Sequence, residues 1–156
     1  MEKNKGQELR KAYNYALTLL DYRERSQWEI KERMHQKGYT PEVIQQVIDY
    51  LKEHDFLNDR RFSEWWANSI IKKGFARRGV YYELRKKGIP KDLIEEVVGK
   101  LFSKIDETEM ALRVVQKRCK MPKSERDFQR ISGFLRRRGY SFSVINTVIE
   151  QLKDKA

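Results

Sequence analysis

The amino-acid sequence predicts an all-α protein made of three tandem three-helix repeats, about nine helices in an extended, curved array. Three observations predict this fold. A basic residue and a glycine, followed by the same pattern of apolar residues, occur three times, and the glycines of this signature, Gly38, Gly88 and Gly139, are 50 and 51 residues apart. The apolar residues around each glycine have helical spacing, and no segment shows the alternation typical of a strand. Glycine and proline are scarce, and the three prolines and the three glycines of the signature fall between the periodic segments.

The repeats are expected at residues 8–57, 58–105 and 106–156. Each begins with a helix, here the A helix, that is marked by two apolar residues four positions apart. These pairs are Ala16 with Leu20, Ala67 with Ile71, and Ala111 with Val115.

The second helix of each repeat, the B helix, is expected to end at the glycine, because glycine suits the left-handed residue that closes a last turn. Apolar residues stand eight and four positions before each glycine: Ile30 and Met34, Val80 and Leu84, Ile131 and Leu135. In the first repeat, Ser26 and Glu29 have the spacing of a capping box, which marks the start of this helix. In the third repeat a longer link, around residues 121–124, precedes the B helix.

The third helix, the C helix, carries five apolar residues at fixed distances after the glycine. They are Val43, Ile44, Val47, Ile48 and Leu51; Leu93, Ile94, Val97, Val98 and Leu101; and Val144, Ile145, Val148, Ile149 and Leu152. Their spacing gives one apolar stripe per helix. The outward positions are largely acidic, for example Glu42, Asp49 and Glu95. Since carboxylates repel phosphate, we do not expect the C helix to read a DNA groove as in a helix-turn-helix protein.

Positive charge is unevenly distributed along the chain. The 156 residues include 34 lysines and arginines and 23 acids, a net charge of +11. Residues 1–57 hold ten bases and ten acids, residues 58–105 hold twelve and six, and residues 106–156 hold twelve and seven. The second and third repeats are therefore expected to attract nucleic acid or an acidic protein surface.

The candidate partner-binding residues are the bases at the ends of the A helices and on the B helices of these two repeats. They are Lys72, Lys73, Arg77, Arg78, Arg85, Lys86, Lys87, Lys117, Arg118, Lys120, Arg136, Arg137 and Arg138. Three aromatic residues stand where the other repeats carry different residue types. Trp65, aligned with Asn14 and Glu109, is either exposed or covers a junction between repeats, and we favour the junction. Tyr81 and Tyr82 serve either a partner contact or packing between repeats.

No catalytic or metal-binding constellation is visible. His35 and His54 stand apart from other ligands, and no phosphate-binding loop or nucleophile motif occurs. We therefore expect a protein that is not an enzyme and uses no metal or cofactor. The single cysteine, Cys119, excludes an intramolecular disulfide and fits a reducing cytoplasm. No apolar run is long enough to cross a membrane and no signal peptide is visible, so we expect a cytoplasmic monomer.

Four short motifs, in this order and spacing, resemble those of the RecX family, bacterial regulators of the RecA recombinase. They are residues 22–26 (YRERS), 56–62 (FLNDRRF), 73–79 (KGFARRG) and 83–89 (ELRKKGI). The resemblance covers residues from about 9 to 152. The segment before Leu9 has no counterpart, so we expect residues 1–7 to be disordered or poorly ordered.

The resemblance implies a non-enzymatic regulator that binds the RecA–DNA filament along its helical groove. It would mostly inhibit the ATPase, strand-exchange and coprotease activities in recombination, DNA repair and the SOS response. The basic faces are then candidates for contact with filament DNA or with an acidic surface of RecA. Two alternatives remain: a stand-alone nucleic-acid-binding repeat protein, and a scaffold whose basic face is incidental.

Overall fold

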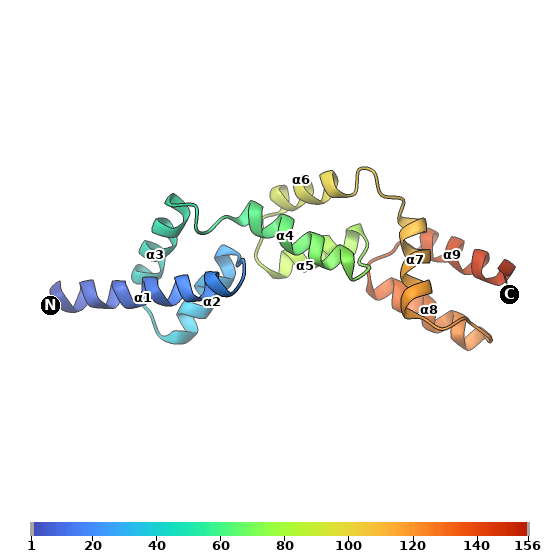
Figure 1. Cartoon of the computed structure of the whole chain (residues 1–156), viewed down its shortest axis with the longest axis horizontal. Coiled ribbons are helices and arrows are strands. Elements are labelled where there is room, and N and C mark those ends of the chain that lie inside the picture. The colour runs from blue at the N-terminus through green and yellow to red at the C-terminus, as the bar shows by residue number, and fades with distance from the viewer. Residues whose placement is uncertain (1, 156) are drawn as a thin grey trace.

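The computed structural model describes residues 2–155, and within this range it consists of nine α-helices without a strand (Figure 1). The first unit contains α1 (Glu2–Tyr22), α2 (Gln27–Lys37) and α3 (Pro41–Glu53). The second contains α4 (Asp59–Lys72), α5 (Arg77–Lys86) and α6 (Lys91–Leu101). The third contains α7 (Glu107–Arg118), α8 (Glu125–Arg137) and α9 (Phe142–Lys155). The prediction of three tandem three-helix units, each with an A, a B and a C helix, is confirmed.

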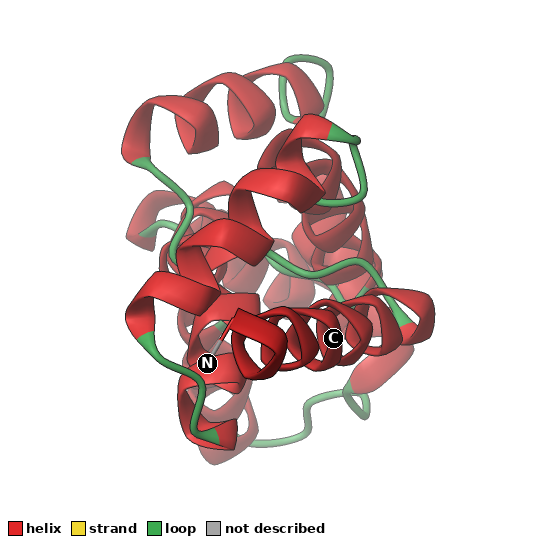
Figure 2. Cartoon of the chain, turned by 90° about the vertical axis from the view of Figure 1, so that its left-hand side faces the viewer, coloured by secondary structure: helices red, strands yellow, loops and turns green. Residues whose placement is uncertain are grey.

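The units follow one another along the long axis of the molecule (Figure 1). The two ends of the chain lie at opposite ends of this axis, and the view from the N-terminal end shows the helices of later units behind those of the first (Figure 2). The array is therefore extended, and its units meet at two junctions.

Each unit has its own hydrophobic core. The apolar residues predicted on the C helices are all buried or half-buried in these cores, for example Ile48, Ile94 and Val148, each fully buried. Burying an aliphatic side chain contributes about 1.5–3 kcal/mol, so these residues supply much of the stability of each unit. None of the helices in the described part of the chain has the length and hydropathy needed to cross a bilayer.

The three glycine turns have the same conformation. Gly38, Gly88 and Gly139 have φ of +99°, +76° and +92°. Each glycine N–H donates to the carbonyl three residues before it, and the next N–H donates to the carbonyl five residues before it. This is the Schellman motif, and it turns the chain from the B helix into the C helix.

The start of the first helix differs from the sequence-based expectation. Residues 2–7, which we expected to be poorly ordered, are helical in the structure as the first turns of α1, whereas Met1 lies outside the described residues. Glutamate, lysine and glutamine favour helices, which explains this extension. The third unit has the longer link before its B helix that the sequence predicts, at residues 119–124, and α8 has 13 residues against 11 in α2 and 10 in α5. Ser124 caps this longer B helix about one turn earlier, relative to the glycine, than Ser26 caps α2.

Candidate partner interface

The B helices of successive units meet end to end. The carbonyl oxygen of Lys87, at the end of α5, accepts a 2.7 Å hydrogen bond from the Ser26 hydroxyl at the start of α2. In the same way, the carbonyl oxygen of Arg138, at the end of α8, accepts a 2.8 Å bond from the N–H of Ala76 at the start of α5. The helix α5 therefore runs from one junction to the other.

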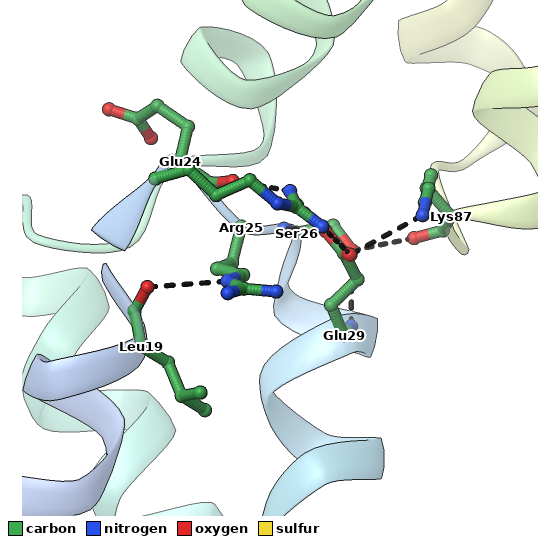
Figure 3. Close-up of polar contacts among 7 residues, drawn as sticks. Leu19, Glu24, Arg25, Ser26, Glu29 and Lys87 are labelled. Carbon is green, nitrogen blue, oxygen red and sulfur yellow. Dashed lines mark hydrogen bonds and ion pairs between the residues drawn. The ribbon is translucent and has the colours of Figure 1, made fainter. Parts of the chain in front are cut away.

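At the junction of units 1 and 2, Glu29 lies between two cations (Figure 3). Its carboxylate is 2.6 Å from Nη2 of Arg23 and 3.4 Å from Nζ of Lys87, and it accepts a 3.1 Å bond from the N–H of Ser26. Burial acts to raise the pKa of Glu29, but the bonds from Arg23 and Ser26 and the two positive charges outweigh it, so its pKa lies below the usual value. The charges of Arg23 and Glu29 in unit 1 and of Lys87 in unit 2 therefore hold these two units together.

The same junction holds three aromatic rings. The Lys87 ammonium is 4.9 Å from the centroid of the Trp66 ring, and the Arg23 guanidinium is 5.8 Å from the Trp65 ring. The Trp28 side chain lies against Gly88, where an added Cβ would be 2.3 Å from the Trp28 Cβ. Trp65 thus lies at the junction, with 39% of its surface exposed, and Lys87 is half-buried in it.

The junction of units 2 and 3 is built from backbone contacts. A Cβ on Gly139 would be 2.2 Å from the nitrogen of Gly79, so these two backbone segments lie too close together to admit a side chain between them. The Arg138 guanidinium donates to the Lys73 carbonyl and lies 4.7 Å from the Phe75 ring. These contacts make Arg138, like Lys87, a residue of the junction.

Tyr140 adds a buried polar contact to this junction. Its hydroxyl donates a 2.9 Å hydrogen bond to the Gly74 carbonyl. Burial raises the pKa of Tyr140 far above its usual value, so the phenol keeps this proton at all physiological pH values.

The remaining basic candidates are exposed. Those of unit 2 fall into two groups, because some lie near the start of α5, at one junction, and others near its end, at the other junction. The ten residues of α5 span about 15 Å, which separates the two groups. Exposed bases at or next to the ends of α4, α7 and α8 and at the start of α5 are here called the junction cluster: Lys72, Lys73, Arg77, Arg78, Lys117, Arg118, Arg136 and Arg137. At the junction of units 2 and 3, the Lys73 carbonyl accepts from Arg138, the charges of Arg118 and Arg137 act on Arg138, and Arg77 and Arg78 line a cleft with Gly139. Near the other junction lie Arg85 and Lys86, and Lys120 lies in the link after α7. The basic candidates of unit 2 therefore do not form one patch, and two of them, Lys73 and Lys87, contact residues about 60 positions away in the other units.

A cleft of about 530 Å³ opens beside the junction cluster, lined from both units. Arg77, Arg78 and the half-buried Tyr81 form part of its wall, with the carboxylates of Glu95 and Glu107. Burial raises the pKa of Glu107 even though Arg77 acts against this change. Guanidinium groups beside an aromatic face can bind carboxylate or phosphate and can stack on a ring.

Tyr82 lies elsewhere, on the surface of α5. Its ring is 62% exposed, and the Lys86 ammonium is 4.7 Å from the ring centroid. Tyr81, like Trp66, packs against the core of unit 2 and also lines the cleft, whereas Tyr82 is exposed to solvent.

Sequence reasoning missed Arg23, Glu29 and Gly79 as junction residues. A signal existed for two of them. Glu29 belongs to the capping box, and a glycine inside a helical pattern, as at Gly79, indicates a close approach of another backbone. Nothing in the sequence marks Arg23 as a junction residue, because its contacts there depend on how unit 2 docks on unit 1. Among the described residues there is no group of His, Cys, Asp and Glu side chains arranged to hold a metal ion.

Comparison with known proteins decides the family. The models of the first, second and third three-helix domains of RecX match residues 12–51, 58–98 and 105–149. The chain belongs to the RecX family. RecX proteins are regulatory and non-enzymatic.

Several RecX proteins are similar over most of this chain. Regulatory protein RecX of Bacillus subtilis is 36% identical over 152 residues, which are 95% of this chain and 57% of that protein. The chain therefore spans little more than half of the length of that relative. Regulatory protein RecX of Trichlorobacter lovleyi is 31% identical over 144 residues, 89% of this chain and 94% of that protein. The crystal structure of RecX from Lactobacillus salivarius superposes with a TM-score of 0.75 at 21% identity, covers 95% of this chain and 98% of that one, and shows the same fold.

Proposed function

We propose that this RecX protein binds the RecA–DNA filament and mostly inhibits its ATPase, strand-exchange and coprotease activities in recombination, repair and the SOS response. The observation that carries the proposal is the junction cluster, a set of exposed bases at the ends of four helices, several of which lie at the junction of units 2 and 3. A RecA–DNA filament offers two acidic targets, its phosphates and the carboxylates of its protomers. A concentrated positive surface suits both.

The extended arrangement of the units supports the same function. Units placed in line present basic residues near both junctions rather than on one compact face (Figure 1). Such an array can contact more than one protomer in a filament groove, which multiplies weak contacts. We include in the proposal that the protein acts as a monomer in the bacterial cytoplasm, where RecA works.

The experiment measures RecA ATPase on single-stranded DNA with increasing amounts of this protein. Wild type is expected to inhibit at stoichiometric amounts. The double variant Arg77→Glu/Arg78→Glu should raise the half-inhibitory concentration by about tenfold or more, since it reverses two charges of the junction cluster. The matched control is Lys100→Glu/Lys104→Glu, which changes net charge equally on exposed residues outside that cluster.

Circular dichroism checks that each variant is folded. Absence of inhibition by wild type would refute the proposed function, whereas equal inhibition by both double variants would remove Arg77 and Arg78 from the interface.

A second candidate function is direct binding of nucleic acid without RecA. The observation that favours it is the cleft, where Arg77 and Arg78 accompany the ring of Tyr81. Binding of labelled single-stranded DNA should then be measurable alone and weaken steeply with salt. Tyr81→Leu should reduce it about fivefold or more through lost base stacking. Undetectable binding at low salt would exclude this function.

A further inference from the structure

The place where a glycine turn meets the preceding B helix is occupied at one junction and open at the other. At the junction of units 1 and 2, the Trp28 side chain lies against Gly88. Trp28 stands ten residues before the turn glycine of its unit, and Arg78 stands ten residues before that of unit 2. At the junction of units 2 and 3, where Arg78 replaces the tryptophan, the cleft of about 530 Å³ opens beside Gly139. The cleft therefore lies where the other junction holds a flat bicyclic ring.

The walls of this cleft carry both signs of charge. Arg77 and Arg78 line it with guanidinium groups, and Glu95 and Glu107 line it with carboxylates. Glu95 is exposed and lies 4.0 Å from the Lys91 ammonium. Glu107 is half-buried and forms no ion pair with any described residue. A half-buried carboxylate without a cationic partner is available to accept hydrogen bonds from a ligand.

The rest of the wall is largely apolar. Val98 and Val144 line the cleft, and Tyr81 lines it while packing against the core of unit 2. The volume of about 530 Å³ falls in the range of about 300–1,000 Å³ that small-molecule sites occupy. Aliphatic and aromatic side chains favour a flat ring, and every nucleobase offers a π-face for such a contact.

The mixed charge of the cleft narrows the class of ligand. An acidic peptide would bring carboxylates against Glu95 and Glu107, and a basic peptide would bring cations against Arg77 and Arg78. A nucleotide suits both pairs, because its phosphate is an anion and its base carries N–H donors. A purine also has the bicyclic shape of the indole ring at the other junction.

Among the bases, guanine matches a carboxylate best. Its N1–H and its N2 amino group lie side by side, so one carboxylate can accept from both at once. Adenine, cytosine and thymine each offer a single donor group on the same edge. An unpaired carboxylate in the wall therefore discriminates in favour of guanine.

We propose that the cleft between units 2 and 3 binds one unstacked guanine of single-stranded DNA. The base lies against Tyr81, its N1–H and N2 amino group donate to the Glu107 carboxylate, and Arg77 and Arg78 bind the adjoining phosphates. This inference rests on the second candidate function, direct binding of nucleic acid, and adds to it a preference among bases.

The first test compares two labelled oligonucleotides, a run of thymines and the same run with one central guanine. Wild type is expected to bind the strand with guanine at least about fivefold more tightly, because a bidentate contact discriminates between bases. Glu107→Gln keeps the size of the side chain but not its two equivalent acceptors, so the preference should disappear, although the loss of a negative charge should strengthen binding of both strands. The matched control is Glu109→Gln, in the same first turn of α7 but exposed and outside the cleft, and it should keep the preference.

Two variants of Arg78 test the place of binding. Arg78→Trp introduces the residue of unit 1 and should fill the cleft, so the guanine preference should be lost. Arg78→Gln removes the same charge without filling the cleft, so it should weaken binding of both strands and keep the preference. Circular dichroism checks that each variant is folded. A preference that survives in both Glu107→Gln and Arg78→Trp would overturn the inference, and equal binding of both strands by wild type would overturn it while leaving the second candidate function intact.

A titration with free nucleotides distinguishes failure of the inference from failure of that function. dGMP is added to the isotope-labelled full chain, and dTMP is the matched control. We expect saturable shifts of the Gly139 amide resonance with dGMP that are lost in Arg78→Trp. If neither strand binds but dGMP shifts Gly139, direct binding of nucleic acid fails and the cleft is a site for a free guanine nucleotide. If dGMP leaves Gly139 unmoved, or dTMP shifts it equally, the guanine site itself is refuted.

Discussion

The two junctions achieve the same end-to-end docking of B helices by different means. Units 1 and 2 are joined by a charge cluster, in which Glu29 holds Arg23 and Lys87 beside tryptophan rings. Units 2 and 3 are joined by backbone approach, in which Gly79 and Gly139 leave no room for a side chain. The repeats thus share the place where their units dock but not the interactions at that place. The two junctions should therefore respond differently to the loss of a charge and to the addition of a side chain.

The largest effect is expected for Gly139→Ala. The new Cβ would lie 2.2 Å from the Gly79 nitrogen, on a residue with a φ of +92°. We expect a loss of about 3 kcal/mol, as backbone strain and displacement of unit 3 combine. Gly38→Ala is the matched control, because Gly38 has a similar φ of +99° but nothing within 4 Å of the added atom. It should lose about 1 kcal/mol. Urea unfolding followed by circular dichroism compares the two, and equal losses would show that the backbone contact contributes nothing.

The next largest effect is expected for Glu29→Gln at the other junction. The amide leaves Arg23 and Lys87 half-buried beside each other without a counter-charge. We expect a loss of about 2 kcal/mol. Tryptophan fluorescence during urea unfolding reports on this junction because Trp65 and Trp66 lie there. Glu32→Gln, an exposed neighbour on α2, should be neutral, and a comparable loss in it would argue against the cluster.

A smaller effect is expected from acid. The pKa of Glu29 lies below its ordinary value of 4.5, so its stabilisation is complete above that pH and is lost as the pH falls through the lowered pKa. Asp59 acts in the opposite direction, because burial raises its pKa despite the bond from the Gln27 N–H, and protonation then favours the folded chain. Tryptophan emission between about pH 5 and about pH 2 should change in wild type and much less in Glu29→Gln. Identical acid transitions would separate Glu29 from this response.

The smallest effect is expected for Arg60→Ala. Its guanidinium is 2.5 Å from Glu96 inside unit 2, but the two side chains are 55% and 62% exposed. Solvent screens such a pair, so the free energy of unfolding should stay close to that of wild type when urea unfolding is followed by circular dichroism. A loss as large as that of Glu29→Gln would mean that short distance, rather than burial at a junction, sets the value of an ion pair in this chain.

Local periodicity was enough to predict the helices and their cores. The apolar residues of the C helices recur at fixed distances from the glycine, and helix geometry alone places them on one face. The start of α1 was missed because residues 2–7 have helix-forming composition but no apolar face that repeats. Helical preference without packing leaves little trace in a periodic pattern.

The site could be predicted less well, for a physical reason. Lys87 and Arg138 stand in basic runs and look like their neighbours, yet their partners Ser26 and Lys73 are 61 and 65 residues away. Whether a base meets solvent or another unit depends on docking geometry, which the residue type does not encode. The assignment of Trp65 to a junction came from comparing the units, and the structure places it at the junction of units 1 and 2.

Because the B helices are arranged end to end, their helix dipoles also add up along the molecule. Helices α8, α5 and α2 point the same way, so each junction places the carbonyl end of one helix dipole against the N–H end of the next. The partial charges cancel at both junctions and survive at the outer ends, positive at Ser124 and negative at Lys37 and Gly38. A filament of identical protomers also has a direction, so under the proposed function the array should lie along the RecA filament in one orientation and not in the reverse.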